Sequence, residues 1–283
     1  MIVQPTNIAS EMIVRRTNEV RGRRIFVTPE NSAMKHLCYG RIILDPDMPR
    51  TAFETGNMEV GLVCLSGKCR VDLEGRHELA RHQVARHQLA RYDAIYIPRS
   101  SRVTVNTETS VDLAECSAEV EGNYPAQVVR YSDVERNGSL KFTTGGPSNK
   151  RTVSILLGKN IEAGRILAGV TTSEPGNWTS WPPHEHASML EELYLYYDMP
   201  APAFGVQLVY TNAVEPEVVA IVREGDVVLM PQGFHPNVAV PDHPINFVWM
   251  MAAHREVEDR QYGVVTVQPG FDKGESGLEA SLK

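Results

Sequence analysis

Short runs of apolar residues, separated by turn residues, recur along the whole chain. They are rich in Val, Ile, Leu and Tyr, and many such runs with regular turn signals predict a β-sandwich or β-barrel. No long stretch carries the 3.6-residue period of an amphipathic helix, so we expect an all-β protein. The runs that we interpret as strands are 61–67, 93–98, 102–106, 110–115, 152–158, 166–172, 192–197, 204–210, 217–222, 226–231, 246–252 and 262–267.

The two halves of the sequence resemble each other. In the first half, apolar residues separate Asp93 from Pro98, and in the second half Asp226 and Pro231 stand in the same pattern. A repeat of domain size indicates duplication, so we expect two similar β-barrels. The Gly- and Pro-containing stretch 145–151 lies between them, and we interpret it as a linker.

The composition is that of an ordinary globular protein. Of the 283 residues, 42% are hydrophobic and 22% are charged, and no apolar run approaches the roughly 18 residues of a membrane span. The net charge of −7 disfavours nucleic-acid binding, for which a basic face is usual. The first residues lack the basic start and apolar block of a signal peptide. We therefore expect a cytoplasmic protein with neither a membrane nor a nucleic-acid partner.

The cysteines form no C-x-x-C motif; they are Cys38, Cys64, Cys69 and Cys116. We expect all four to be reduced and partly buried, as is usual in a reducing compartment. Cys64 and Cys69 are five residues apart, so on one regular strand their side chains would point to opposite faces.

A smaller repeat, HELAR-HQVAR-HQLAR, covers residues 77–91 and carries His77, His82 and His87. Its period of five fits neither a strand nor a helix. Histidines at regular spacing also suggest a zinc-binding tract, but each repeat carries an arginine that would repel a cation. We interpret the repeat as an exposed loop between two strands.

The strongest chemical signal is His184-Glu-His186, followed by a carboxylate and, further on, by His235 in a Gly-Phe-His turn. Two histidines one residue apart lie on the same face of an extended chain, so both imidazoles can reach one metal ion. Two histidines, a glutamate and a distant histidine form a mixed nitrogen and oxygen site. This set suits Zn, Mn, Fe, Co or Ni, and the sequence does not select among them.

The sequence motifs around these residues indicate a family more specifically than the spacing of the ligands does. The motifs are GNWTSWPPHEH, EELYLYY, FGVQLVYT, GDVVLMPQGFHP and WMMAAHRE. They resemble the 5-deoxy-glucuronate isomerase family of inositol catabolism, a sister of the 5-keto-4-deoxyuronate isomerases of pectin breakdown. The resemblance is strong over 150–256 and traceable over 20–135.

The resemblance implies a bicupin, with two cupin (jelly-roll-like) β-barrels of which only the second holds metal. In the first half, Glu59 stands near the start of its barrel strand, but no His-x-His precedes it. We predict an N-terminal cupin barrel without a metal site over 1–144 and a C-terminal metal-binding cupin barrel over 151–283.

Carried over residue by residue, the resemblance implies the metal ligands His184, His186, Glu192 and His235, binding one divalent ion per chain (Zn, Mn or Fe). Simple cupin spacing favours Glu191 as the carboxylate, whereas the register of the family's strand favours Glu192. Because loops absorb insertions and strands do not, we prefer Glu192. Alternation then places Tyr194 and Tyr196 on the ligand face, and Leu193 and Leu195 on the other.

The resemblance implies a metal-dependent aldose–ketose isomerase that converts 5-deoxy-glucuronate to 5-dehydro-2-deoxy-gluconate. Such an enzyme moves a proton between two carbons and needs a general base. The candidates for proton transfer are Glu191, Glu174, Tyr194 and Tyr210, with Gln207 orienting the substrate. The candidates for a cationic clamp on the acid group are Arg165, Arg223 and Arg255.

The expected partners are a small sugar acid and further copies of the chain in a homo-oligomer. Two other functions fit a cupin, because that fold hosts many chemistries. One is a different metalloenzyme, such as a 5-keto-4-deoxyuronate isomerase, a dioxygenase or an epimerase. The other is a sugar-binding cupin without catalysis.

Overall fold

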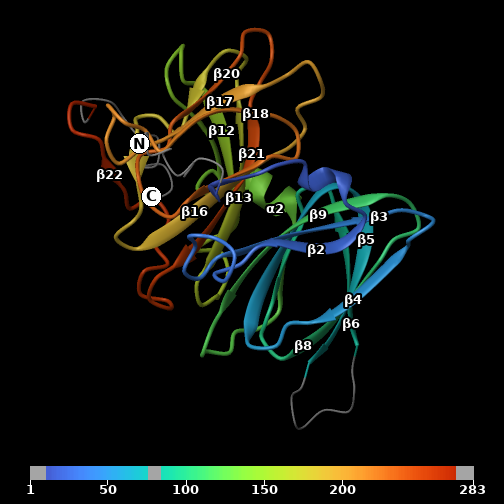
Figure 1. The fold of residues 1–283 in the computed structure, drawn as a ribbon. Coiled ribbons are helices and arrows are strands. Elements are labelled where there is room, and N and C mark those ends of the chain that lie inside the picture. Colours follow the sequence, from blue (N-terminus) through green and yellow to red (C-terminus); the bar gives the residue numbers. More distant parts are fainter. Residues whose placement is uncertain (1–10, 76–83, 272–283) are drawn as a thin grey trace, which may run out of the picture.

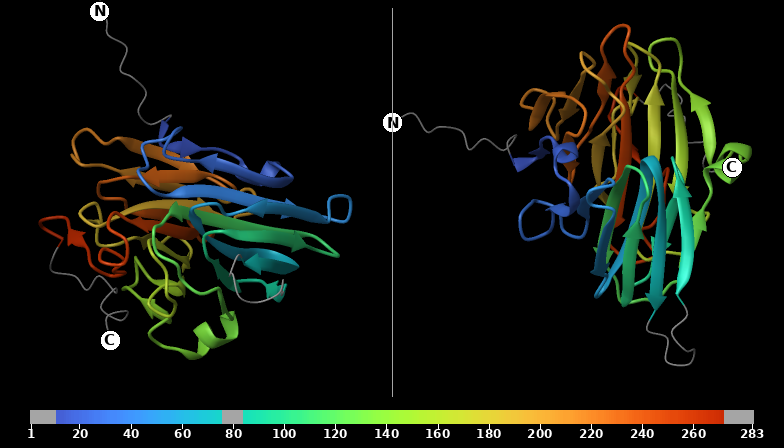
Figure 2. Two further views of the ribbon diagram at one scale, coloured as in Figure 1. Left: turned by 90° about the horizontal axis from the view of Figure 1, so that it is seen from below. Right: turned by 90° about the vertical axis from the view of Figure 1, so that its right-hand side faces the viewer.

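The computed structural model describes residues 11–75 and 84–271, and it consists of two β-structured halves packed side by side (Figures 1 and 2). The prediction of an all-β protein is confirmed. The helices whose bounds lie wholly within the described ranges are the 3-10 turn η1 (Thr17–Glu19) and the short helix α2 (Tyr131–Arg136). No helix there is long and apolar enough to cross a membrane.

The N-terminal half, as we call strands β2 to β10, is built around one long strand that belongs to two curled antiparallel layers. Its strands are β2 (Gly22–Val27), β3 (Cys38–Leu44), β4 (Arg50–Glu54), β5 (Met58–Gly75), β6 (Ala85–Ala90), β7 (Ala94–Ile97), β8 (Ser101–Asn106), β9 (Val111–Glu119) and β10 (Gln127–Val129). In the described residues one layer has the order β10-β7-β5-β9-β3-β2. β8 and β6 pair with the far end of β5, and β4 pairs with β8.

The C-terminal half, as we call the remaining strands, has the same plan. They are β1 (Ile13–Val14), β11 (Lys141–Thr144), β12 (Arg151–Leu157), β13 (Ile166–Ser173), β14 (Trp178–Thr179), β15 (His184–Glu185), β16 (Leu190–Tyr196), β17 (Gly205–Val209), β18 (Val218–Val222), β19 (Val227–Met230), β20 (Asn237–Ala239), β21 (Asn246–Ala253) and β22 (Thr266–Val267). In the described residues the larger sheet has the order β1-β19-β16-β21-β13-β12-β11, the smaller has β14-β20-β17-β18, and β15 pairs with β22.

Strand alternation sorts the buried side chains into three hydrophobic cores. One core fills the interior of the N-terminal half, and it contains Leu62 and Cys64. A second lies inside the C-terminal half, and it contains Tyr194 and Tyr196. The third lies between the halves, where Leu193 meets side chains of the N-terminal half. The leucines of β16 therefore pack against the other half of the same chain.

The strands do not divide between the halves in chain order. β1 precedes every strand of the N-terminal half in the chain, yet it pairs with β19 of the C-terminal half. β11 pairs with β12, so the stretch that we interpreted as a linker forms the turn of a β-hairpin in the larger C-terminal sheet. The division at 1–144 and 151–283 stays a prediction; in the described residues the passage between halves follows β10.

Two expectations about individual segments were wrong. The repeat at 77–91 is not a loop throughout, because residues 85–90 form β6 and His87 faces Val71 on β5; His77 and His82 lie outside the described residues. Of the run 262–267, only Thr266–Val267 is a strand.

The expectation that Cys64 and Cys69 face opposite sides was also wrong. Both thiols lie in the core of the N-terminal half, because a bulge between Cys64 and Ser66 shifts the alternation of β5 by one residue. All four cysteines are buried and free, as the sequence predicted.

Candidate metal centre

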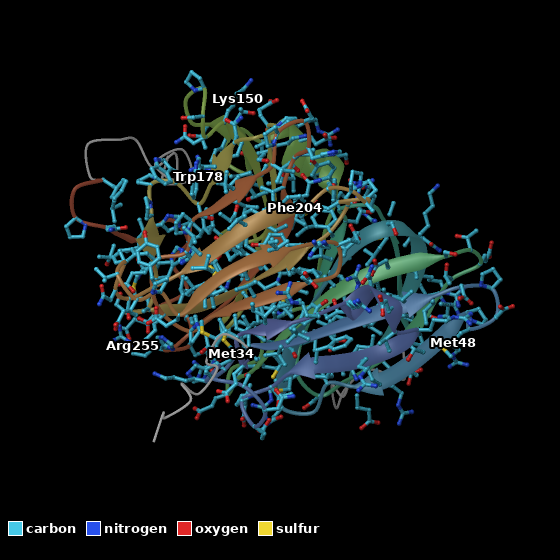
Figure 3. All side chains as sticks on the ribbon, turned by 45° about the horizontal axis from the view of Figure 1, so that its top comes forward. Met34, Met48, Lys150, Trp178, Phe204 and Arg255 are labelled. Atoms are coloured by element: carbon cyan, nitrogen blue, oxygen red, sulfur yellow. The ribbon has the colours of Figure 1, made fainter. Side chains whose placement is uncertain are left out.

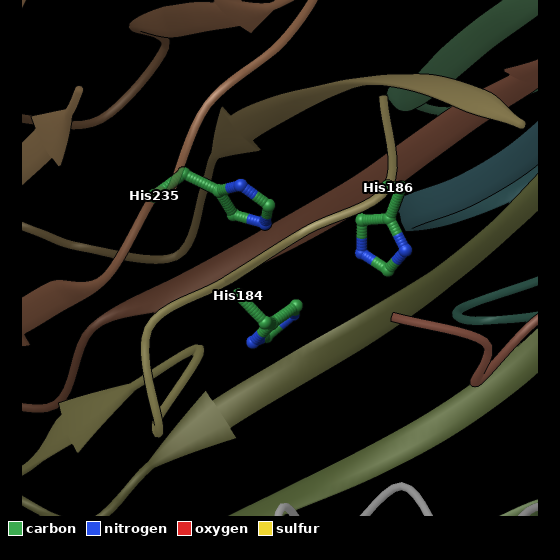
Figure 4. A group of neighbouring side chains, drawn as sticks. All are labelled: His184, His186 and His235. Carbon is green, nitrogen blue, oxygen red and sulfur yellow. The ribbon is translucent and has the colours of Figure 1, made fainter. Parts of the chain in front are cut away.

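Three histidines converge inside the C-terminal half (Figure 4). His184 lies on β15, His186 follows that short strand, and His235 stands between β19 and β20. One ring nitrogen of each lies within 4.8 Å of the others. All three side chains are buried, and His235 is only 2% exposed. The fold thereby brings the His-x-His pair and the distant histidine together at a single point.

Backbone carbonyls orient each ring. The Nδ1 atom of His184 lies 2.8 Å from the Pro182 oxygen, and the Nδ1 atom of His235 lies 2.9 Å from the Gly233 oxygen. The Nδ1 atom of His186 lies 3.4 Å from a backbone oxygen as well. Because a carbonyl only accepts, this arrangement places the proton on Nδ1 and leaves the lone pair on Nε2. Metal-binding histidines are usually fixed in this way.

Glu192 completes the cluster. Its Oε2 atom lies 3.0 Å from Nε2 of His235 and 3.4 Å from Nε2 of His186. Neither Glu192 Oε2 nor His235 Nε2 has a hydrogen-bond partner in the described part of the chain. A carboxylate oxygen and an unprotonated ring nitrogen are both acceptors, so their close approach is favourable only with a cation between them. These residues therefore fit a divalent metal ion.

The electrostatics of the three rings agree with this geometry. Burial lowers the pKa of His184, and His235 and His186 lower it further. Burial also lowers the pKa of His186. For His235 burial acts in the same direction, but the adjacent Glu192 outweighs it and raises the pKa. The raised pKa of His235 reflects the negative charge of Glu192 beside it, and that charge also favours a metal cation at this point. Neutral imidazoles are the form that binds metal.

A pocket opens beside the cluster, and its empty volume is about 390 Å³ when its open mouth is counted. The centre of a water molecule can reach about 40 Å³ of it, so the pocket is narrow. Apolar rings of Phe247 and Trp249 form part of its wall, together with Tyr262. Such a pocket suits a small polar ligand whose reacting end lies against the histidines.

Strand alternation decides which of the two neighbouring glutamates joins the histidines. Glu192 and Tyr194 line the pocket, whereas Glu191 points to the opposite face of β16. The carboxylate of Glu191 is fully buried between the halves, where it accepts hydrogen bonds from the backbone N–H groups of Lys35, His36 and Leu37. Those contacts occupy both of its oxygens, so the structure does not bring Glu191 to the site.

Of the other residues that we singled out for proton transfer, only Tyr194 lines the pocket. Its hydroxyl lies 2.7 Å from that of Ser180, and burial raises its pKa well above the ordinary value. The hydroxyl of Tyr210 donates to Gln268, and Tyr210 is not among the residues that line the pocket. Glu174 is exposed beside Lys150.

Gln207 supports the site from behind. Its side-chain N–H groups donate to the backbone oxygens of His235 and Pro236, and its oxygen accepts from Tyr196 and Asn237. All its polar atoms are thereby engaged in holding the turn that presents His235. The position predicted to orient the substrate therefore orients a histidine.

None of the three arginines that we expected to clamp an acid group lines the pocket. Arg165 donates to the backbone oxygens of Ala253 and His254. Arg223 stacks over Phe204. Arg255 lies at the surface (Figure 3), 62% exposed.

The structure brings a different arginine to the wall. Arg151, the first residue of β12, is 5% exposed and lines the pocket with His184 and Glu192. Sequence reasoning missed it because it stands at the end of an apparent linker. The available signal was that it directly precedes the apolar run TVSILLG.

Comparison with known proteins agrees with the fold and the site. Residues 12–264 match the KduI/IolB family. The chain is 30% identical over 240 residues to the 5-deoxy-glucuronate isomerase of Geobacillus kaustophilus, covering 82% of this chain and 84% of that one. It is 29% identical to the protein of the same name from Bacillus subtilis, covering 76% and 80%.

Two solved structures show the fold. An IolB-like protein from Salmonella typhimurium superposes with a TM-score of 0.77 at 21% identity, covering 92% of this chain and 97% of that one. A Bacillus subtilis oxalate decarboxylase, studied for its Mn(II) centres, gives 0.63 at 11% identity, covering 95% and 85%. The prediction of a bicupin is thus confirmed. With the match over most of its length, the chain belongs to the KduI/IolB family.

Proposed function

We propose that this protein is a metal-dependent aldose–ketose isomerase that converts 5-deoxy-glucuronate to 5-dehydro-2-deoxy-gluconate in inositol catabolism. The relatives reported above carry the name of that enzyme. The observation that carries the proposal is the approach of Glu192 Oε2 to within 3.0 Å of His235 Nε2 in a buried pocket. Two such acceptors are held together at a site that fits a cation and a small polar ligand.

In this proposal His184, His186, Glu192 and His235 hold one divalent ion, with zinc, manganese and iron as the candidates. A bound divalent ion supplies Lewis-acid stabilisation of negative charge on a substrate oxygen. The cytoplasmic location and the homo-oligomer stay predictions.

The chain's own residues have separate tasks in this reaction. An aldose–ketose isomerisation moves one proton between neighbouring carbons and another between their oxygens. Tyr194 keeps its proton at neutral pH because its pKa is raised, so it acts as a hydroxyl donor toward a substrate oxygen. The Ser180 hydroxyl, 2.7 Å away, holds the Tyr194 hydroxyl in position. The aromatic wall of Phe247 and Trp249 excludes water from the reacting atoms.

The direct test is ¹H NMR of the purified protein with 5-deoxy-glucuronate. We expect the aldose signals to give way to those of the ketose. A chelator should abolish the conversion, and one equivalent of metal per chain should restore it. The proposal is wrong if the protein, reconstituted in turn with Zn, Mn and Fe, leaves the aldose unchanged. Two metal equivalents per chain would contradict the assignment of a single site.

A further inference from the structure

Two aromatic side chains in the pocket wall carry polar groups without a hydrogen-bond partner. The indole Nε1–H of Trp249 has none in the described part of the chain, although Trp249 is only 3% exposed. The hydroxyl of Tyr262 likewise makes no hydrogen bond to a described residue. Both side chains line the pocket beside the histidines. Because buried polar groups in folded proteins are nearly always paired, two such groups in one pocket wall indicate a polar ligand.

The fold leaves a defined place for the indole. Trp249 on β21 stands opposite Gly169 on β13. A Cβ atom at Gly169 would lie 2.1 Å from Cζ2 and 2.6 Å from Cε2 of the indole, so the strand has a glycine where the ring comes close. Cε2 is bonded to Nε1, so the close contact positions the edge of the ring that carries the N–H. Tyr262 stacks on the indole, with ring centroids 4.8 Å apart and planes at 21°. We call Trp249 and Tyr262 the aromatic pair.

The segment that carries Tyr262 is tied to the metal centre. The oxygen of Val264 lies 3.4 Å from Nδ1 of His186. Further along the same segment, Val267 of β22 pairs with His184 of β15. One stretch of chain therefore contacts two of the histidines and supplies one ring of the aromatic pair, so the fold sets the position of the pair relative to the metal centre.

The polar groups of the aromatic pair match the hydroxyl groups of a sugar. An indole N–H only donates, so its partner must be an oxygen with a free lone pair, whereas a tyrosine hydroxyl both donates and accepts. Burial raises the pKa of Tyr262, and Glu192 raises it further, so the hydroxyl keeps its proton at neutral pH. The substrate of the proposed function carries hydroxyl groups on the carbons between its carbonyl and its carboxylate. A hydroxyl group can take part in both kinds of hydrogen bond.

We propose that the aromatic pair binds hydroxyl groups of the sugar acid: the indole N–H of Trp249 donates to one hydroxyl oxygen, and the hydroxyl of Tyr262 makes a hydrogen bond with a neighbouring one. This inference rests on the proposed function and deepens it, because it assigns the part of the substrate beyond the reacting end. Both residues are binding residues, and they position the sugar chain while its carbonyl lies at the histidines.

The first test compares Tyr262→Phe with the matched control Tyr124→Phe, each loaded with one metal equivalent. Tyr124 does not line the pocket, and its hydroxyl donates to Glu256 at 2.7 Å. We expect Tyr262→Phe to raise KM for 5-deoxy-glucuronate by roughly 2- to 10-fold, as for the loss of one neutral hydrogen bond, with kcat little changed. Its resistance to urea without substrate should equal that of the wild type, because the hydroxyl that is removed has no partner in the protein.

Tyr124→Phe should show the reverse pattern, a loss of stability with an unchanged KM, because its hydroxyl is bonded within the protein. An unchanged KM in Tyr262→Phe would overturn the binding role of its hydroxyl. A loss of stability in Tyr262→Phe as large as that in Tyr124→Phe would overturn it as well, since the hydroxyl would then serve the fold.

The indole N–H resonance of Trp249 provides a second measurement that needs no turnover. The chain has three tryptophans, and Trp249→Phe identifies this resonance in a ¹⁵N–¹H correlation spectrum by its loss. We expect glucuronate, added to the wild type loaded with diamagnetic zinc, to move the Trp249 proton downfield. The resonance of Trp178, which does not line the pocket, should stay in place.

A Trp249 resonance that an excess of glucuronate leaves in place would overturn the proposal. If that resonance moves but the protein leaves 5-deoxy-glucuronate unchanged with each of the candidate metals, the proposed function fails while the binding of hydroxyl groups by the aromatic pair stands.

Discussion

The strand that carries Glu192 has a counterpart in the N-terminal half. β16 pairs with β19 and β21 as β5 pairs with β7 and β9, and the registers superpose: Glu192 faces Met230 where Val60 faces Ile97. The position of the metal-centre carboxylate is therefore a valine in the other half. The comparison teaches that the scaffold tolerates either an apolar or an acidic side chain at this point.

The difference extends along the strand. Leu62 occupies the position of Tyr194, and Cys64 that of Tyr196. In the N-terminal half these side chains join an aliphatic core, whereas in the C-terminal half Tyr194 lines a pocket beside three histidines. The first interior is packed for stability, and the second keeps polar atoms and an opening.

One residue earlier, the halves agree. Glu59 and Glu191 are equivalent in register, and each carboxylate crosses to the other half. Glu59 accepts hydrogen bonds from the backbone N–H groups of Gly164, Arg165 and Ile166, as Glu191 does from three residues before β3. Both carboxylates are fully buried. The two halves thus share their mutual contact and differ in their interiors.

Among the changes that test the contrast between Glu192 and Val60, we expect the largest effect on metal affinity. We expect Glu192→Gln to weaken metal binding by more than the roughly 10- to 100-fold that is typical of losing an outer-shell partner, because the charged ligand itself is removed. Val60→Ala, at the matched position, should leave metal affinity unchanged. Titration against a competing chelator measures both. Loss of metal from Val60→Ala, or its retention by Glu192→Gln, would break the contrast.

The next largest effect, on stability, tests whether the buried carboxylates Glu59 and Glu191 play equivalent roles in the two halves. An amide in place of Glu59 or Glu191 loses the charge and places an NH₂ group against backbone donors. We expect each Gln variant to lower the free energy of unfolding by about 2 to 3 kcal/mol, the scale of hydrogen bonds to a charged group. Urea unfolding measures this, and metal content should not change in either variant. A cost in only one of the two would show that the contacts are not equivalent.

The smallest effect concerns two carboxylates at the contact between halves whose pKa values shift in opposite directions. Burial raises the pKa of Glu224 above its ordinary 4.5. For Glu256 burial acts the same way, but hydrogen bonds from Tyr124 and the backbone of Glu121 and Gly122 outweigh it and lower the pKa. The stabilising contribution of Glu224 is thus present below pH 4.5 and lost as the pH rises through its folded value. That of Glu256 is present above pH 4.5 and lost as the pH falls through its folded value.

Glu224→Gln should therefore be slightly more stable than the wild type at pH 7, with no difference in acid. Glu256→Gln should be less stable at pH 7, and its deficit should shrink in acid. Urea unfolding at several pH values checks both signs. Parallel pH profiles for the two variants would contradict the assignment.

The sequence predicted what depends on local pattern. Apolar runs located most core strands, and the spacing of His184 and His186 indicated their convergence. The repeated aspartates have a local role as well: Asp93 accepts from the Ala90 N–H, and Asp226 from the Arg223 N–H, so each closes the turn before its strand. The repeat in the sequence is a repeat of this turn.

What the sequence could not predict depends on contacts between distant segments. The partners of Glu191 are more than 150 positions away, so its burial at the contact between halves leaves no local trace. Arg151 reaches the pocket because a hairpin and a loop fold together, which no spacing encodes. The bulge between Cys64 and Ser66 reverses the facing of later residues on β5. Gly67, which follows it with a positive φ of 76°, was the available signal.

The order of strands along the chain has a consequence for how such a protein can evolve. The C-terminal sheet takes in β1 from the start of the chain and β11 from before residue 145, so no single cut yields a C-terminal half with all its strands. A gene fragment that kept only 151–283 would expose two unpaired sheet edges and leave Glu191 without its backbone donors. The chain before residue 151, whichever chemistry its own interior supports, therefore supplies strand pairing and backbone donors that the C-terminal half needs, so deleting it would cost that half its stability.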